Sequence, residues 1–86
     1  MSDLKAQFEQ AQIDIKTLTE RPSNDDMLTM YANFKQATAG DVSGKRPGMM
    51  DMVGRAKYDA WAKLEGTSAE DAMQAYVDKA NELLGR

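Results

Sequence analysis

The sequence contains neither cysteine nor histidine, and it has only two prolines and few aromatic residues. Without cysteine there is no disulfide framework, so packing has to stabilise the fold. The two absences also exclude most zinc sites and thiol catalysis, and they remove the commonest general base. Serine-based and carboxylate-based chemistry stays open, but no nucleophile-elbow or phosphate-loop glycine pattern is present. We therefore expect no catalytic residues and no metal site.

Long apolar runs are absent as well, so no segment can cross a bilayer, and the N-terminus has no basic-then-apolar signal region. These features predict a cytoplasmic protein without stable membrane insertion. The 86 residues are enough for one domain with a small core, and we treat residues 1–86 as that single domain.

The formal net charge of −3 argues against a general nucleic-acid binder, which needs a basic face for phosphate contacts. The charge is also uneven along the chain. Residues 1–34 hold three basic against six acidic residues, and residues 64–86 hold two against five, whereas residues 35–63 hold six against three. A positive middle between negative ends indicates an anionic partner, although chance explains the counts equally well.

Apolar spacing predicts four helices. The first has one stripe at alternating steps of four and three, formed by Leu4, Phe8, Ala11, Ile15 and Leu18. Ser2 or Asp3 can cap its start, and it should end before Pro22. The second begins at Ser23, where Asp26 completes a pattern like a capping box, and runs to about residue 39 before a terminating glycine.

A loop at residues 40–49, with three glycines and a proline, separates the second helix from the third. The third helix lies between Asp51 and Glu65, and its expected apolar face comprises Val53, Ala56, Ala60, Trp61 and Leu64. Thr67 and Ser68 both offer caps for the fourth helix, which ends at Gly85. The pattern predicts an all-α four-helix bundle, in which the long loop permits a crossover between parallel helices.

A lysine accompanies an aromatic residue on each of the two middle helices. Tyr31 and Lys35 share a face of the second helix, and Lys57 shares a face with Trp61 on the third. A lysine on an apolar face usually extends to water, but it can also meet an anion. The occurrence of this pair on two helices favours binding of an anion. A nucleotide-like ligand would use both residue types, because a phosphate needs point charges and a heterocyclic base needs flat aromatic walls.

Seven methionines are many for a chain of this length. They supply flexible apolar surface that suits a ligand of variable shape, although for any single methionine soft core filling is the better interpretation.

Three stretches, "MLTMYANFKQATAGD", "RPGMMDMVGRAKYDAW" and "LEGTSAEDAMQAYVDK", closely resemble the acyl-CoA-binding proteins. The resemblance covers nearly the whole chain and is weakest over residues 1–20. It implies an up-down-down-up four-helix bundle that binds medium- to long-chain acyl-CoA without covalent chemistry. It further implies a monomeric intracellular carrier and pool former, with no cofactor, that contacts acyl-CoA-using enzymes transiently.

The resemblance also implies a set of site residues. The CoA head group would contact Lys16, Tyr31, Phe34, Lys35, Lys57 and Tyr76, and the acyl groove would be bordered by Phe8, Met27 and Leu28. The sequence departs from the family pattern where Phe34 replaces a usual tyrosine and Val53 replaces a common lysine, while Arg55 keeps the positive charge of its position. Both losses predict weaker head-group binding.

Two other functions remain open from the sequence. The first is a helical protein-interaction module whose apolar groove takes an amphipathic partner helix. The second is an acyl-CoA hydrolase, for which no convincing nucleophile or water-activating group is present.

Overall fold

The computed structural model describes residues 3–86, and within that range it consists of helices and connecting segments without strands. The elements are α1 (Leu4–Asp14), a 3₁₀ turn η1 (Ile15–Thr17), α2 (Asn24–Ala39), α3 (Met52–Ala62) and α4 (Ala69–Leu84). The predicted all-α architecture of four helices is therefore confirmed.

Helix ends follow the predicted capping residues. The hydroxyl oxygen of Ser23 accepts a hydrogen bond from the Asp26 backbone N–H at 3.1 Å, and Ser68 caps α4 in the same way. Gly40 ends α2 at a φ of 81°, a left-handed value that favours glycine. Asp3 caps α1 by accepting from the Lys5 N–H, whereas the alternative cap, Ser2, lies outside the described residues.

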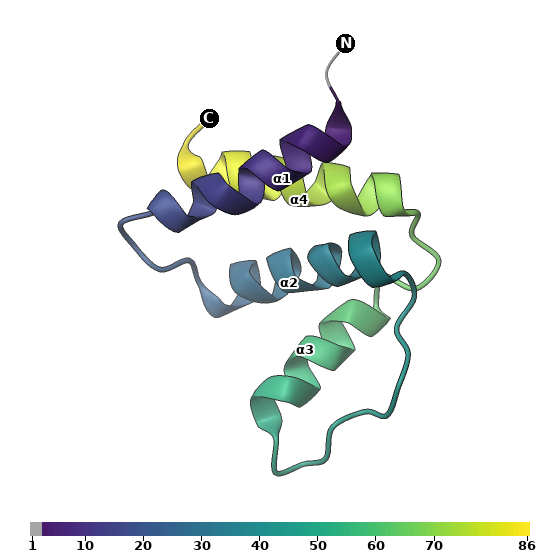
Figure 1. Cartoon of the computed structure of the whole chain (residues 1–86). Coiled ribbons are helices and arrows are strands. Elements are labelled where there is room, and N and C mark those ends of the chain that lie inside the picture. The colour runs from purple at the N-terminus through teal and green to yellow at the C-terminus, as the bar shows by residue number, and fades with distance from the viewer. Residues whose placement is uncertain (1–2) are drawn as a thin grey trace.

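Figure 1 shows α1 and α4 side by side in one layer, α2 against them, and α3 beyond α2. α1 and α4 run in one direction and α2 and α3 in the other, which is the predicted up-down-down-up order (Figure 1). The long loop runs along the outer side of α3, to which Arg46 and the Gly44 carbonyl are hydrogen-bonded, and α3 then returns roughly parallel to α2 (Figure 1). Within residues 3–86, α3 packs against α2 and against no other helix.

The hydrophobic core lies between α1, α2 and α4. Its buried members are Phe8, Ala11, Met30, Tyr76, Val77 and Ala80. The ring of Phe8 meets Tyr76 edge-on with centroids 5.0 Å apart, and Phe34 lies 6.0 Å from Phe8. Such aromatic contacts fix the three helices relative to one another.

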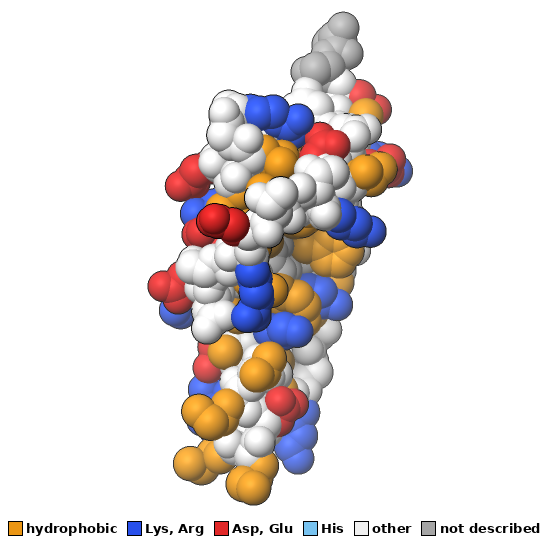
Figure 2. Space-filling model, turned by 90° about the vertical axis from the view of Figure 1, so that its left-hand side faces the viewer, with side chains coloured by type: hydrophobic (Ala, Val, Ile, Leu, Met, Phe, Trp, Pro, Cys, Tyr) orange, Lys and Arg blue, Asp and Glu red, His pale blue; other side chains and the backbone are white. Residues whose placement is uncertain are grey.

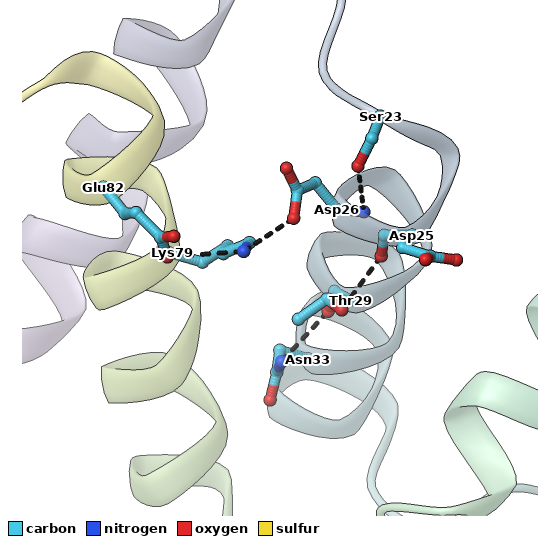
Figure 3. A network of polar contacts seen from close by, with 7 residues as sticks. All are labelled: Ser23, Asp25, Asp26, Thr29, Asn33, Lys79 and Glu82. Atoms are coloured by element: carbon cyan, nitrogen blue, oxygen red, sulfur yellow. Dashed lines mark hydrogen bonds and ion pairs between the residues drawn. The ribbon is translucent and has the colours of Figure 1, made fainter.

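An ion pair joins α4 to the start of α2 (Figure 3). The Lys79 ammonium lies 2.6 Å from a carboxylate oxygen of Asp26 and 3.3 Å from Glu82. The hydrogen bond from Lys79 lowers the pKa of Asp26, and the same contact raises the pKa of Lys79. The carboxylate of Asp26 therefore binds Lys79 on α4, while its backbone N–H donates to the Ser23 hydroxyl oxygen that caps α2 (Figure 3).

A second polar cluster ties the two connections on either side of α3 to the end of α2. The buried Gln36 donates from Nε2 to Asp41 at 2.8 Å and to the Thr67 carbonyl at 2.9 Å. The same Asp41 oxygen accepts from the Gly66 N–H, and these hydrogen bonds lower the pKa of the Asp41 carboxyl. Trp61 adds a hydrogen bond from Nε1 to the Gly40 carbonyl at 2.8 Å. The C-terminal end of α3 is thereby fixed against α2.

The structure corrects two expectations for α3. The helix ends at Ala62, and a turn then leads to Gly66, because the chain has to reverse toward α4. Val53 was expected on the apolar face, but it is 67% exposed. Within the described residues α3 has only α2 as a helical neighbour, so no second helix covers this position.

No helix within residues 3–86 is both long enough and apolar enough to span a bilayer.

Candidate functional site

A cavity of about 450 Å³ opens between α2 and α3. It is lined by Arg21, Asn24, Met27, Leu28, Tyr31, Met52, Val53, Ala56 and Lys57. The α2 residues of this set follow steps of three and four, and the α3 residues are two adjacent pairs four positions apart. Helical geometry therefore places each group on one face of its helix. The volume falls within the range of about 300–1,000 Å³ that is typical of small-molecule sites.

Two lysines cover aromatic rings across the boundary between α2 and α3. The ammonium nitrogen of Lys57 lies 5.3 Å from the centroid of the Tyr31 ring, and that of Lys35 lies 4.9 Å from the centroid of the Trp61 ring. Tyr31 and Lys35 are one turn apart on α2, as Lys57 and Trp61 are on α3. Because α2 and α3 run roughly parallel, moving one turn along both helices leads from the Lys57–Tyr31 contact to the Lys35–Trp61 contact.

The sequence predicted a lysine beside a ring within each helix, whereas the structure pairs each lysine with a ring of the other helix. This arrangement gathers two positive charges where α2 meets α3, and one of them, Lys57, also lines the cavity. Such a site can hold an anionic group at its edge and an apolar chain inside.

The structure divides the nine predicted site residues among three places. Tyr31, Lys57, Met27 and Leu28 line the cavity, and Lys35 lies one turn beyond it. Phe8, Phe34 and Tyr76 form the aromatic cluster of the core between α1, α2 and α4. Lys16 is exposed on η1.

Tyr76 has a low exposure of 4%, and burial raises the pKa of its hydroxyl. Phe8 is equally buried. In this structure both residues pack as core residues.

Five cavity residues were not among the predicted site residues: Arg21, Asn24, Met52, Val53 and Ala56. The α3 members share a face with Lys57, and this spacing could have identified them. Arg21 precedes α2 in a connecting segment, so helical periodicity gave no signal for it.

The described residues 3–86 contain no cluster of three or more acidic side chains that could hold a metal ion.

Comparison with known proteins identifies the family. The family model described as Acyl CoA binding protein matches residues 5–80. The chain belongs to the acyl-CoA-binding protein family. It is 49% identical to acyl-CoA-binding domain-containing protein 6 of Arabidopsis thaliana, over 94% of this chain and 88% of the relative. It is 48% identical to an acyl-CoA-binding protein homolog of Manduca sexta, over 94% of this chain and 91% of the relative.

Solved structures of the acyl-CoA-binding protein family share the fold. The crystal structure of Oryza sativa acyl-CoA-binding protein 2 superposes with a TM-score of 0.91 at 43% identity, covering 95% of this chain and 89% of that one. The crystal structure of ACBP from Moniliophthora perniciosa gives a TM-score of 0.88 at 47% identity, covering 99% and 82%. The bundle architecture expected from the resemblance is confirmed.

Proposed function

We propose that this chain binds medium- to long-chain acyl-CoA thioesters without covalent chemistry and carries them as a monomer in the cytoplasm. The observation that supports this function best is the apolar cavity between α2 and α3 with lysine–aromatic pairs at its edge. Family membership supports the same ligand, since the matching relatives are named for acyl-CoA binding.

The acyl chain would occupy the cavity. Its apolar wall comes from both helices, with Met27 and Leu28 on α2 and Met52, Val53 and Ala56 on α3. Burial of each methylene contributes up to about 0.8 kcal/mol. Eight additional methylenes would therefore add at most about 6 kcal/mol, less the cost of ordering the chain. Methionine side chains adapt to chains of different length, because they are unbranched and polarisable.

The CoA head group would lie where the two lysines meet the rings. Lys35 and Lys57 would donate to phosphate oxygens, and Tyr31 would supply a hydroxyl and a ring face. Each charge-assisted hydrogen bond contributes about 1.5–3 kcal/mol. Arg21 is a further cation at the cavity wall, but it precedes α2, whereas Lys35 lies near the end of that helix.

The remaining family positions are part of the same proposal, although they lie outside the cavity wall. Lys16 would reach the head group from η1. Phe34 and Tyr76 would meet it, and Phe8 would meet the acyl chain, at the edges of the aromatic cluster. Side-chain rearrangement on binding is common even where the backbone stays fixed.

We further propose that this protein is a carrier and not an enzyme. The proposed contacts hold both ends of the thioester, and none of these side chains is a nucleophile with an adjacent base. The carrier would then hand its ligand to enzymes that use acyl-CoA through transient contacts.

Titration calorimetry with acetyl-CoA, decanoyl-CoA, palmitoyl-CoA and free palmitate tests the function. We expect affinity to rise along the acyl-CoA series and free palmitate to bind far more weakly than palmitoyl-CoA. Equal dissociation constants for acetyl-CoA and palmitoyl-CoA would show that the acyl chain is not bound in the cavity. Release of free CoA thiol during incubation with palmitoyl-CoA would show an enzyme instead.

A further inference from the structure

A second cavity, of about 320 Å³, lies between α2 and α3 beside the first cavity, which Tyr31 and Lys57 line. The walls of the second cavity include Asp25, Thr29 and Asn33 on α2, and Ala60, Lys63 and Leu64 at the end of α3 and just after it. Leu28 lines both cavities. The two spaces are therefore neighbours that share one side chain.

Leu28 lies between the two cavities on the surface of α2. Successive residues of an α-helix are rotated by about 100° around its axis. Met27 and Tyr31, which line the first cavity, therefore lie on one side of Leu28. Asp25 and Thr29, which line the second, lie on the other side. The cavities flank α2, and the side chain of Leu28 is the partition between them.

One face of α3 covers both cavities. Val53 and Ala56 line the first cavity, and Ala60 and Leu64 line the second. These four apolar residues follow one another at steps of three and four, which places them on the same face. The smallest side chains, those of Ala56 and Ala60, lie in the middle, where the strip passes from one cavity to the other. A continuous apolar strip thus runs past the partition that Leu28 forms.

The polar groups around the second cavity leave its interior suited to an apolar ligand. The Thr29 hydroxyl donates to the Asp25 carbonyl at 2.9 Å, and the buried Asn33 donates from Nδ2 to the Thr29 carbonyl at 2.9 Å (Figure 3). Asp25 and Lys63 are exposed residues, so their charged groups stay in water. A charged occupant would have no buried charge to pair with here, whereas an apolar one would contact Leu64.

The first cavity is open at the end where α2 and α3 begin. Figure 2 views the molecule from this end and shows hydrophobic side chains gathered around the start of α3. Met52 and Val53, which line the cavity there, are both exposed. A long acyl chain that continued past them would end in water. A chain that crossed Leu28 would bury the same methylenes in the second cavity, and burial of each methylene is favourable.

We propose that the second cavity binds the terminal methylenes of acyl chains that are too long for the first, and that Leu28 moves aside to admit them. The inference rests on the proposed acyl-CoA function and extends its ligands to very-long-chain acyl-CoA. The head group stays at Lys35 and Lys57, and the first part of the chain fills the first cavity. The chain end then follows Ala56 and Ala60 across the partition. Affinity should consequently continue to rise beyond palmitoyl-CoA.

The variant Thr29→Phe tests this path. Thr29 is exposed and lines only the second cavity, so a phenyl ring there would occupy that space and leave the first cavity open. The matched control is Thr38→Phe, an exposed threonine of α2 that also bonds to the carbonyl four residues earlier but lines neither cavity. Competition against radiolabelled palmitoyl-CoA, below the concentration at which acyl-CoA forms micelles, measures the affinity for palmitoyl-CoA and tetracosanoyl-CoA.

We expect Thr29→Phe to lower the affinity for tetracosanoyl-CoA at least about tenfold, since two methylenes that lose their burial are enough for that change. Its affinity for palmitoyl-CoA should be nearly unchanged, and Thr38→Phe should behave as the wild type. Wild-type affinity of Thr29→Phe for tetracosanoyl-CoA would overturn the proposal. An equal fall with both ligands would also overturn it, because the effect would not depend on chain length. Failure of the wild type to bind palmitoyl-CoA would instead refute the proposed function, and this inference with it.

Nuclear Overhauser contacts in the wild-type complex locate the chain end directly. With tetracosanoyl-CoA that carries ¹³C in its terminal methyl group, we expect contacts from this methyl to Ala60 and Leu64. Contacts to Met52 and Val53 alone would place the chain end at the open end of the first cavity and overturn the proposal.

Discussion

The ammonium nitrogen of Lys57 lies 5.3 Å from the centroid of the Tyr31 ring on the neighbouring helix, and Lys35 repeats the contact with Trp61 at 4.9 Å. A cation over an aromatic ring at an exposed site contributes about 0.5–1 kcal/mol. A charge-assisted hydrogen bond to a phosphate contributes about 1.5–3 kcal/mol. The rings therefore hold both lysines near the cavity without competing effectively against a phosphate ligand.

We predict that Lys35→Ala and Lys57→Ala each weaken palmitoyl-CoA binding at least about tenfold, the effect of one lost charge-assisted hydrogen bond. The fold should persist, because a single surface cation–ring contact contributes little to stability. Titration calorimetry measures the affinity and circular dichroism checks the fold. Lys5→Ala, an exposed lysine on α1, controls for net charge and should bind normally. Wild-type affinity for palmitoyl-CoA in both variants would show that neither lysine binds the ligand.

We predict that Ala56→Phe abolishes most of the preference for long chains. Ala56 lines the cavity, and a phenyl ring there would occupy volume that an acyl chain needs. The affinity for palmitoyl-CoA should fall at least about tenfold, while that for acetyl-CoA should change little. Calorimetry with both ligands gives the comparison, and Ala75→Phe on the exposed face of α4 is the size-matched control. A retained chain-length preference in Ala56→Phe would place the acyl chain elsewhere.

We predict that acid weakens the link between α2 and α4. The pKa of Asp26 is lowered from its usual 3.8 by Lys79, so its stabilising contribution is complete above that value and is lost as pH falls through the lower folded-state pKa. The pKa of Lys79 is raised from its usual 10.5, so its contribution is lost only as pH rises through the higher folded-state pKa. The link should therefore contribute fully between pH 3.8 and 10.5.

Thermal unfolding followed by circular dichroism from neutral to acidic pH tests this window. Lys79→Ala should be less stable near neutrality and should lose less stability on acidification than the wild type. Acid sensitivity should not vanish, since the pKa values of Asp14, Asp41 and Asp59 are lowered by other partners. Parallel acid profiles for Lys79→Ala and the wild type would show that the ion pair contributes nothing.

We predict that Trp61→Phe destabilises the fold by about 1–3 kcal/mol, because it leaves a carbonyl oxygen without its donor. The lost donor is Nε1, which bonds to the Gly40 carbonyl at 2.8 Å and helps hold α3 against α2. Urea unfolding followed by circular dichroism measures the change, since the only tryptophan is removed. Tyr58→Phe is the matched control, because its hydroxyl bonds to a loop carbonyl at an exposed position. An equal loss in both variants would mean that this hydrogen bond has no special role at the α2–α3 boundary.

The sequence by itself determined where most helices begin and end. Ser23, Ser68, Gly40 and Gly85 act on their own termini through local hydrogen bonds and backbone angles, so their effect is visible without the fold. The motifs around Tyr31 and Lys57 were also sufficient to indicate the family, because they are long and rich in uncommon residues.

Only the tertiary structure decided which side chains meet. Periodicity gives the face of a helix but not the neighbour that the face will contact. The lysines consequently cover rings on the opposite helix, and Phe8 and Tyr76 pack in the core and not in the cavity wall. Val53 has an apolar side chain and a helical position suited to packing, yet it is exposed because it lines the open cavity between α2 and α3. Burial depends on how helices from distant parts of the sequence pack, which local sequence does not specify.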